Sequence, residues 1–243
     1  MSEPVIFSTA GPVATITLHR PDCRNAVDGP TAALLKQAFA RFDADAALAV
    51  AVLTGGGGQF CAGADLKAVA DPARRNAVTP DGSGSGPMGP TRMAFTKPVI
   101  AAIEGHAVAG GLELALMCDL RVAAASAVFG VFCRRWGVPL IDGGTVRLPR
   151  IVGQGRALDM ILTGRAVPAH EALAEAQALA LQIAGFPQAC LRIDRASALA
   201  QWDLDLPAAL RHEGAAASAV VQAEGVAGAA LFAAGAGRHG RPA

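Results

Sequence analysis

The chain has 243 residues and a mass of 24.5 kDa, the length of one large domain or of one domain with a small appendage. It is 52% hydrophobic and 17% charged, which allows a substantial core and excludes an intrinsically disordered protein. Lys and Arg number 21 against 20 Asp and Glu, so the formal net charge is +1. This balance, with no basic stripe, argues against a nucleic-acid partner.

A mean hydropathy of +0.37 raises the question of a membrane span. The longest uncharged stretch lies between Asp45 and Asp65, but the glycines of Gly55–Gly58 interrupt it, so we expect no membrane partner. The N-terminus has no basic segment followed by an apolar one, and the five scattered cysteines form no C-x-x-C pair. We therefore expect a cytoplasmic protein with no disulfide framework and no metal site.

The first segments predict a β-hairpin followed by a helix. Val5–Ser8 and Val13–His19 are short strands joined at Gly11 and Pro12. A capping residue followed by proline, at Asp28–Pro30, predicts a helix start. The apolar residues of Leu34–Phe42 then recur at helical spacing.

Two continuous apolar runs, Leu48–Leu53 and Val99–Ile103, predict strands that are buried on both faces. Each run is followed by a glycine-containing turn and a helical segment. The first turn is Cys61–Asp65, and the second contains Gly110 and Gly111 and leads into the segment Leu112–Cys118. The N-terminal two-thirds of the chain therefore alternates strand and helix.

The remaining segments complete the expected α/β pattern. Leu120–Ala123 and Val128–Val131 are further strand candidates, whereas Asp71–Pro90 is rich in Gly, Pro and Ser and predicts a long mobile loop. The last third of the chain is expected to be helical, with segments at Gly155–Leu162, Pro168–Ile183, Pro187–Gln201 and Pro207–Phe232.

Several motifs of other enzyme classes are missing. The chain has no Walker A motif, no G-x-G-x-x-G after a first strand, no G-x-S-x-G nucleophile elbow and no H-E-x-x-H. Hydride transfer, metal-assisted hydrolysis and triad hydrolysis therefore lose their usual support, and we expect no cofactor.

The doubled pattern of buried strand, tight turn and helix predicts two helix N-termini with free N–H groups. If they converge, they form an oxyanion hole, worth about 2.7–4 kcal/mol per donor to a developing enolate. Small residues at Ala62, Gly63 and Gly110 would let a thioester carbonyl approach the backbone, and Glu113 lies about one turn into the second helix. The alternative is two close-packed turns and a surface carboxylate. The presence of both segments favours the site.

Three motifs resemble the enoyl-CoA hydratase/isomerase (crotonase) family: Phe60–Leu66, Ile103–Asp119 and Asp142–Thr145. The opening segment, with Arg20-Pro21 and Arg24–Ala26, is similar to the same family. The resemblance follows the family's order over nearly the whole chain.

The resemblance implies an α/β fold, with a spiral of strand–strand–helix repeats over residues 1–185 that carries an acyl-CoA site. It also implies a C-terminal helical region, residues 186–243, that mediates trimers, often paired into hexamers. The thioester oxygen would lie between the N–H groups of Ala62 and Gly110, and Glu113 matches the first family glutamate. Coenzyme A is part of the substrate, so no separate cofactor is implied. Contacts to coenzyme A are expected at Arg24, Asn25, Ala26, Ala64, Asp65 and Leu66, and Asp71–Pro90 would shape the acyl pocket.

One position departs from the family pattern. Hydratases of the family use a second glutamate, and Cys133 stands at that position, where it is assigned to the substrate-binding wall. A free thiol has a pKa of about 8.5, and burial raises it further, so Cys133 cannot copy a carboxylate. Asp142 is the obvious substitute as a second acid or base. The alternative for Asp142, which we slightly favour here, is an N-cap for the helix that starts at Gly143–Thr145.

Other polar residues of these motifs are interpreted as structural: Asp65 as orienting its turn, His106 as a satisfied histidine and Asp119 as ending the helix that carries Glu113. Arg134–Trp136 could close the pocket or lie at a subunit contact, and we favour surface packing.

The sequence thus predicts an enzyme that hydrates a 2-enoyl-CoA by stabilising a thioester enolate, with Glu113 as acid or base. Because Cys133 replaces the second glutamate, double-bond isomerisation and acyl-CoA decarboxylation stay open as alternatives. A non-catalytic acyl-CoA-binding protein is the alternative from another class. The net charge near zero argues against an RNA-associated member of the family.

Overall fold

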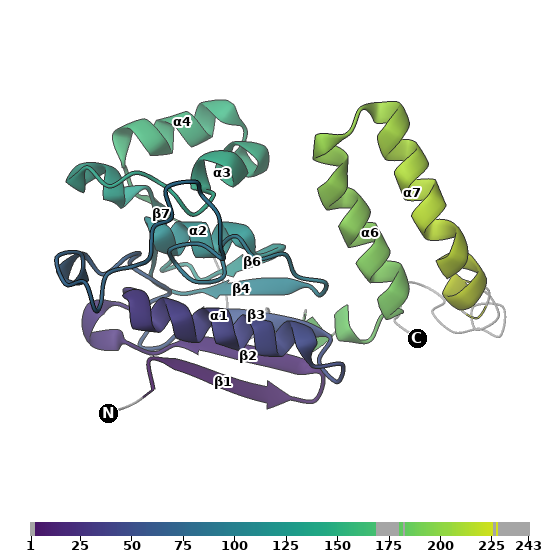
Figure 1. The fold of residues 1–243 in the computed structure, drawn as a ribbon, viewed down its shortest axis with the longest axis horizontal. Helices are drawn as coiled ribbons and strands as arrows, with labels where there is room; N and C mark the ends of the chain where they lie inside the picture. The colour runs from purple at the N-terminus through teal and green to yellow at the C-terminus, as the bar shows by residue number, and fades with distance from the viewer. Residues whose placement is uncertain (1–2, 169–179, 182, 226, 228–243) are drawn as a thin grey trace. The chain divides into compact units, whose positions relative to one another are not determined.

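The computed structural model describes residues 3–168, 180–181, 183–225 and 227 (Figure 1). The chain divides into two compact units, Met1–Ala184 and Gly185–Ala243. The roles predicted for these two parts, an acyl-CoA site and an oligomerisation region, stay predictions. No helix in the described ranges is long and apolar enough to cross a membrane.

The first unit is built on a five-stranded sheet in the order β1-β2-β3-β4-β6. Strands β1 (Val5–Ala10) and β2 (Val13–Leu18) form the predicted antiparallel hairpin. Strands β3 (Val50–Gly55), β4 (Val99–Ile103) and β6 (Leu120–Ala123) then add in parallel. Every residue of β4 is buried, which explains why its sequence is a continuous apolar run.

A second, three-stranded sheet has the order β5-β7-β8. It contains β5 (His106–Val108), β7 (Val128–Gly130) and the short β8 (Val167–Pro168), and an isolated bridge joins Cys61 to Ala107 of β5. Each successive repeat of the chain contributes one strand to each sheet: β4 and β6 belong to the large sheet, and β5 and β7, which follow them, belong to the small one. This is the strand–strand–helix spiral that the family resemblance implied. The sequence analysis missed β5, because three residues are too short to show a periodicity.

Helix α1 (Gly29–Ala44) packs along the hairpin of the large sheet (Figure 1). Its predicted N-cap is confirmed, since a side-chain oxygen of Asp28 accepts the N–H of Thr31 at 3.1 Å. Leu35, Phe39 and Phe42 recur at helical spacing and are fully buried in the main core. The apolar face of α1 therefore packs in the main core against the sheet that supports the site.

Three further helices form a second core. Helix α2 (Gly110–Met117) is buried on all sides apart from its last residue, and it contacts α3 (Gly144–Val152), which in turn packs on α4 (Gln154–Thr163). Their side chains share one apolar cluster with the segment after β7: Leu112, Leu116, Val131, Cys133, Leu148, Ala157 and Met160. The predicted helix Gly155–Leu162 corresponds to α4.

The second unit is helical within its described residues. Helix α6 (Gln188–Ala200) matches the predicted Pro187–Gln201, and a short 3₁₀ turn, η4 (Gln201–Asp203), leads into α7 (Leu206–Val220). Helices α6 and α7 pack against each other. A π-helical turn, η5 (Val221–Gly225), follows, so within the described residues the predicted helix Pro207–Phe232 is interrupted after Val220. Most of the predicted helix Pro168–Ile183 lies outside the described residues, as does the end of Pro207–Phe232.

Candidate active site

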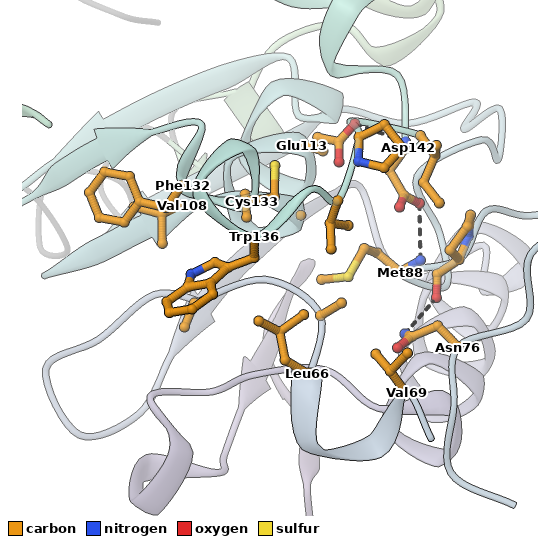
Figure 2. A pocket seen from close by; sticks show the side chains of 18 of the residues that line it. Leu66, Val69, Asn76, Met88, Val108, Glu113, Phe132, Cys133, Trp136 and Asp142 are labelled. Carbon is orange, nitrogen blue, oxygen red and sulfur yellow. Dashed lines mark hydrogen bonds between the residues drawn. The ribbon is translucent and has the colours of Figure 1, made fainter. Parts of the chain in front are cut away.

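A cavity of about 1030 Å³ opens beside the first turn of α2 (Figure 2). Its walls come from the turn after β3, from the loop between residues 69 and 88, and from the 3₁₀ helix η3 (Phe132–Trp136) with the turn that follows it. Most of the site residues predicted from the sequence meet here, although they come from distant parts of the chain: Arg24, Ala62, Ala64, Leu66, Gly110, Glu113, Cys133 and Asp142.

The N-terminus of α2 reaches the cavity because its glycines allow close packing. A Cβ added to Gly111 would collide with the carbonyl oxygen of Cys61, and one added to Gly110 would lie 2.7 Å from Sδ of Met88. Ala109, immediately before the helix, has φ 54° and ψ −127°, a conformation that costs a residue with a side chain of order 1–3 kcal/mol. The packing around α2 thus holds a strained turn at the cavity wall.

The structure corrects one of the two predicted oxyanion donors. The N–H of Ala62 already donates to the carbonyl oxygen of Arg24 at 3.0 Å, so it is not available to a substrate. Two residues on, the N–H of Ala64 has no acceptor within the part of the chain that the structure describes. Gly63, at φ +96°, brings this turn against α2, because a Cβ there would lie 3.0 Å from the nitrogen of Gly110. The free N–H beside Gly110 is therefore that of Ala64.

Gly110 supplies the other free donor. The first hydrogen bond of α2 runs from the N–H of Glu113 to the carbonyl oxygen of Ala109, so the N–H of Gly110 has no partner inside the helix. The positive end of the helix dipole adds to its attraction for a negative oxygen.

Glu113 extends from α2 into the cavity and is 2% exposed. Its Oε1 accepts the N–H groups of Asp142 and Gly144, each at 2.8 Å, whereas Oε2 takes no hydrogen bond from the described residues. Burial raises the pKa of Glu113 to about 7, and the neighbouring Asp142 carboxyl acts in the same direction. A carboxyl with this pKa can both accept and donate a proton at neutral pH.

Asp142 is also buried, at 3% exposure, and it lines the same cavity (Figure 2). The interpretation of Asp142 as a helix cap is wrong. Gly143 is the N-cap of α3 and no side chain caps that helix, whereas Oδ1 of Asp142 accepts the N–H of Met88 at 3.0 Å and the hydroxyl of Thr91. Burial raises the pKa of Asp142 above its usual value. The site therefore contains two carboxyl groups.

Cys133 lies in η3 and is buried in the wall of the same cavity. Burial raises the pKa of its thiol, and the charge of Glu113 raises it further, so the thiol stays neutral at physiological pH. Trp136, three residues later, was interpreted as surface packing. It is 71% exposed, and it also lines the cavity (Figure 2).

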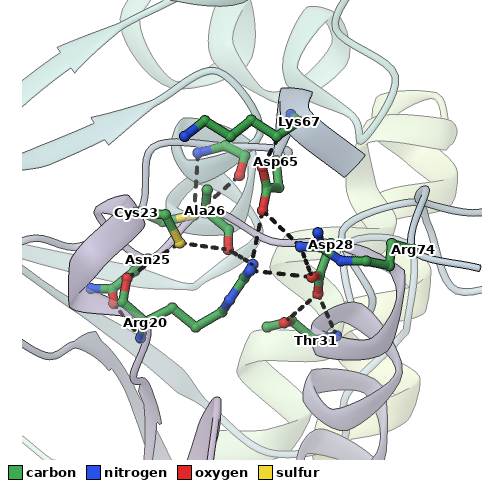
Figure 3. Close-up of polar contacts among 11 residues, drawn as sticks. Arg20, Cys23, Asn25, Ala26, Asp28, Thr31, Asp65, Lys67 and Arg74 are labelled. Carbon is green, nitrogen blue, oxygen red and sulfur yellow. Dashed lines mark hydrogen bonds and ion pairs between the residues drawn. The ribbon is translucent and has the colours of Figure 1, made fainter. Parts of the chain in front are cut away.

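Asp65 has the structural role expected of it (Figure 3). Its Oδ1 accepts the N–H of Lys67 and so caps the 3₁₀ helix η2 (Leu66–Ala68), while Oδ2 pairs with Arg20 at 3.1 Å and with Arg74 at 3.4 Å. Both arginines also pair with Asp28 at the start of α1. This four-residue group connects α1, η2 and the loop that borders the cavity.

Asn25 does not line the cavity. It is fully buried, its Oδ1 accepts the N–H of Arg20 at 2.8 Å, and its Nδ2 donates to the carbonyl oxygens of Gly56 and Gln59. It therefore shapes the turn that follows the 3₁₀ helix η1 (Pro21–Cys23).

Ala26 and Asp65 instead line a smaller pocket of about 330 Å³. This pocket shares Arg24 and Leu66 with the main cavity and also includes Lys67, which the sequence analysis did not single out. The positions predicted to bind coenzyme A are therefore divided between the main cavity, this side pocket and the buried frame.

Thr91, Arg92 and Arg147 were also missed. Thr91 contacts Asp142, and the two arginines donate to backbone carbonyls around it. No local sequence signal marks these residues. The partners of Thr91 and Arg92, for example, are about 50 residues away in the sequence. Among the described residues, no group of three or more His, Cys, Asp or Glu is placed to hold a metal ion.

The chain is similar in sequence and in fold to known proteins of one family. A family model described as enoyl-CoA hydratase/isomerase matches residues 8–224. An (E)-benzylidenesuccinyl-CoA hydratase from Thauera aromatica is 42% identical over 171 residues, covering 70% of this chain and 66% of that protein. The enoyl-CoA hydratase EchA19 from Mycobacterium tuberculosis is 40% identical over 169 residues, covering 67% and 62%. The chain thus spans less than two-thirds of the length of these curated relatives.

Solved structures give a longer match. An enoyl-CoA hydratase from Mycobacterium tuberculosis H37Rv superposes with a TM-score of 0.87 at 34% sequence identity, covering 95% of this chain and 96% of that one. The enoyl-CoA hydratase EchA1 from Mycobacterium marinum superposes with a TM-score of 0.86 at 33% identity, covering 95% and 96%. The chain belongs to the enoyl-CoA hydratase/isomerase family.

Proposed function

We propose that this protein hydrates 2-enoyl-CoA thioesters. The observation that carries the proposal is the presence of two buried carboxyls, Glu113 and Asp142, in one cavity with the free N–H groups of Ala64 and Gly110. Hydration needs these two kinds of group: donors for the thioester oxygen and a pair that moves protons. The relatives whose names describe hydratases support the same reaction.

In the proposed reaction, the thioester oxygen accepts hydrogen bonds from Ala64 and Gly110. These donors stabilise the negative charge that develops on that oxygen as the enolate forms. One carboxyl removes a proton from water as the water oxygen bonds to C3, and the other carboxyl supplies a proton to C2. The pair therefore works with one proton shared between Glu113 and Asp142, and product formation leaves the number of protons on the enzyme unchanged.

Asp142 serves as the second proton-transfer group, a role that the thiol of Cys133 cannot fill. The Cys133 thiol is neutral and buried, so it supplies neither a base nor an efficient acid at neutral pH. Isomerisation needs a single carboxylate and decarboxylation needs mainly the oxyanion donors. The contribution of Asp142 therefore separates hydration from these two alternatives.

The remaining parts of the proposal concern binding, assembly and location. Coenzyme A is part of the substrate, and no further cofactor takes part. The coenzyme A portion of the substrate runs along Arg24 and the turn Ala64–Leu66 toward the side pocket. The second unit mediates a trimer or a hexamer. All five cysteines are free, which suits a reducing cytoplasm.

The test follows the loss of the conjugated thioester when purified protein is mixed with short- and medium-chain trans-2-enoyl-CoA. We expect 3-hydroxyacyl-CoA as the product. Glu113→Gln and Asp142→Asn should each lower kcat by about 10²–10⁴-fold, because each removes one proton-transfer group. Cys133→Ala is the matched control within the same cavity and should stay within a few-fold of the unsubstituted protein.

Each other outcome points to a different reaction. Loss of activity in Glu113→Gln but not in Asp142→Asn, with turnover of 3-enoyl-CoA, would replace hydration by isomerisation. Turnover of malonyl-type thioesters alone would indicate decarboxylation. Binding of acyl-CoA without any turnover would indicate the non-catalytic alternative.

A further inference from the structure

The segment Gly86–Arg92 holds the carboxyl group of Asp142 from one side. Thr91 is fully buried and its hydroxyl donates to Oδ1 of Asp142. The N–H of Met88 donates to the same oxygen at 3.0 Å. Both donors act on Oδ1, whereas Oδ2 accepts no hydrogen bond from the residues that the structure covers. Oδ2 is thus the oxygen left for a ligand in the cavity.

Two arginines connect the backbones on either side of this contact. Arg147 donates to the carbonyl oxygens of Asp142 at 3.1 Å and of Thr91 at 2.8 Å. Arg92 donates to the carbonyl oxygen of Ile141 at 2.6 Å. The guanidinium groups of Arg92 and Arg147 therefore fix the distance between the two backbone segments that carry Thr91 and Asp142. The titratable and charged groups around Asp142 are Glu113, Arg92 and Arg147.

The absence of a side chain at Gly86 provides the room for the contact between Thr91 and Asp142. It has φ +103°, and a Cβ at this position would collide with Oγ1 of Thr91 and would lie 3.0 Å from Oδ1 of Asp142. Gly84, two residues earlier, has a similar φ of +84°, but a Cβ there would meet nothing within 4 Å. Both glycines therefore need a positive φ, but only a side chain at Gly86 would disturb the contact between Thr91 and Asp142.

From these contacts we infer that Thr91 is a positioning residue for the hydration step: it holds Oδ1 of Asp142, presents Oδ2 to the cavity and stabilises the ionised carboxylate. The inference rests on the proposed function, because it gives Asp142 a place in proton transfer. It assigns a catalytic purpose to the glycine-rich loop, which approaches the reacting carboxyl through Gly86 and Thr91.

Thr91→Val and Thr91→Ser test the inference through kinetics. Valine has the shape of threonine without the hydroxyl, and we expect it to lower kcat about 10–100-fold while KM stays within about threefold. A hydrogen bond to the ionised carboxylate lowers its pKa, so its removal should move one limb of the pH–rate profile upward by about one pH unit. Thr91→Ser keeps the hydroxyl and should restore both values. Unchanged kcat in Thr91→Val, or equal losses in the two variants, would overturn the inference.

A titration that does not depend on activity separates this inference from the proposed function. Carbon-13 NMR of labelled aspartate carboxyls follows each ionisation, and Asp142→Asn identifies the Asp142 signal by its disappearance. The pKa of Asp142 should rise in Thr91→Val and not in Thr91→Ser. If the unsubstituted protein hydrates no 2-enoyl-CoA, the proposed function is wrong. If the pKa of Asp142 is the same in Thr91→Val as in the unsubstituted protein, the inferred role of Thr91 is wrong, whatever the activity.

Gly86→Ala and Gly84→Ala form a matched pair that bears on the same contact. Both alanines require a positive φ, so the two variants carry a similar backbone cost. Gly86→Ala alone crowds Thr91, and we expect it to lower kcat at least tenfold relative to Gly84→Ala, with circular dichroism confirming that both are folded. Equal kcat in the two variants would contradict the role of this segment.

Discussion

Glu113 combines two conditions that are seldom found together, deep burial and an ionisable carboxyl at a cavity wall. Burial penalises the charged form and raises its pKa to about 7, while the N–H groups of Asp142 and Gly144 partly offset that penalty. The same environment that makes Glu113 useful for proton transfer near neutral pH therefore has a cost in stability once the group ionises.

This cost predicts a pH-dependent effect of Glu113→Gln. The pKa of Glu113 in the folded protein, about 7, lies above the ordinary value of 4.5 for a glutamate, so the stabilising contribution is complete below pH 4.5 and is lost as the pH rises through 7. Glutamine stays neutral and keeps an oxygen for the two N–H donors. Relative to the unsubstituted protein, we expect the free energy of unfolding of Glu113→Gln to gain about 3 kcal/mol between pH 4.5 and pH 8.

Urea unfolding at pH 4.5, 6 and 8 measures this difference. The exposed Glu213→Gln serves as the matched control, because it makes the same chemical change while leaving the buried carboxyl in place. A stability difference between Glu113→Gln and the unsubstituted protein that is constant across this range would refute the raised pKa.

At the scale of elements, the start of α1 is joined to the loop that borders the cavity. Asp28 caps α1 through Thr31 and pairs with Arg20 at 3.2 Å and with Arg74 at 2.9 Å. The N–H of Gly29 also donates to the carbonyl oxygen of Arg74 at 2.6 Å. The segment predicted from its composition to be a long mobile loop is therefore attached to a helix terminus at one end.

Asp28→Ala and Asp28→Asn separate the cap from the ion pairs. Alanine removes both and should lower the free energy of unfolding by about 2 kcal/mol, the upper part of the range for a lost cap. Asparagine is an equally good capping residue, so its cost should be smaller and should come from the two arginines alone. Urea unfolding provides the measurement. An equal cost for the two variants would show that the ion pairs, and not the cap, dominate.

At the scale of the whole molecule, the second unit presents apolar side chains to solvent. Leu199, Trp202, Leu204 and Val221 are exposed, and they lie on or beside its helices. Leu199, Trp202 and Leu204 are close together in the sequence, at the end of α6, in η4 and in the turn after it, and exposed apolar groups that form a patch mark interaction surfaces. This observation supports the proposal that residues 186–243 mediate assembly.

We accordingly expect the protein to sediment with three or six times the mass of its 24.5-kDa chain. Analytical ultracentrifugation at micromolar concentration measures this, and Leu199→Glu should shift the population toward smaller species, because a charge at a buried contact is costly. Ser197→Glu, two residues earlier on the same helix, is the control for the added charge. A single-chain mass for the unsubstituted protein would remove the assembly proposal.

The sequence by itself determined the elements whose burial is uniform and whose length suffices for a pattern. Val99–Ile103 was predicted with the bounds that the structure shows, because a strand buried on both faces is a continuous apolar run. The bounds of Leu120–Ala123 also agree, although this strand lies at the edge of the sheet, contains Arg121 and has no buried residue. The position of Gly110 and Glu113 in the first turn of a helix was predicted from the order of a buried strand, a glycine turn and a helix along the chain. These features depend on neighbours in sequence.

Only the tertiary structure decided which polar groups are free. The N–H of Ala62 is occupied by Arg24, so the free donor is Ala64, and the carboxyl of Asp142 is held by Met88 and Thr91 rather than by the helix that follows it. An aspartate before Gly143 and Gly144 has the local pattern of a cap. Its actual partners lie 54 and 51 residues away, and a hydrogen bond between such distant residues depends on how the fold brings them together, which no local periodicity or propensity records.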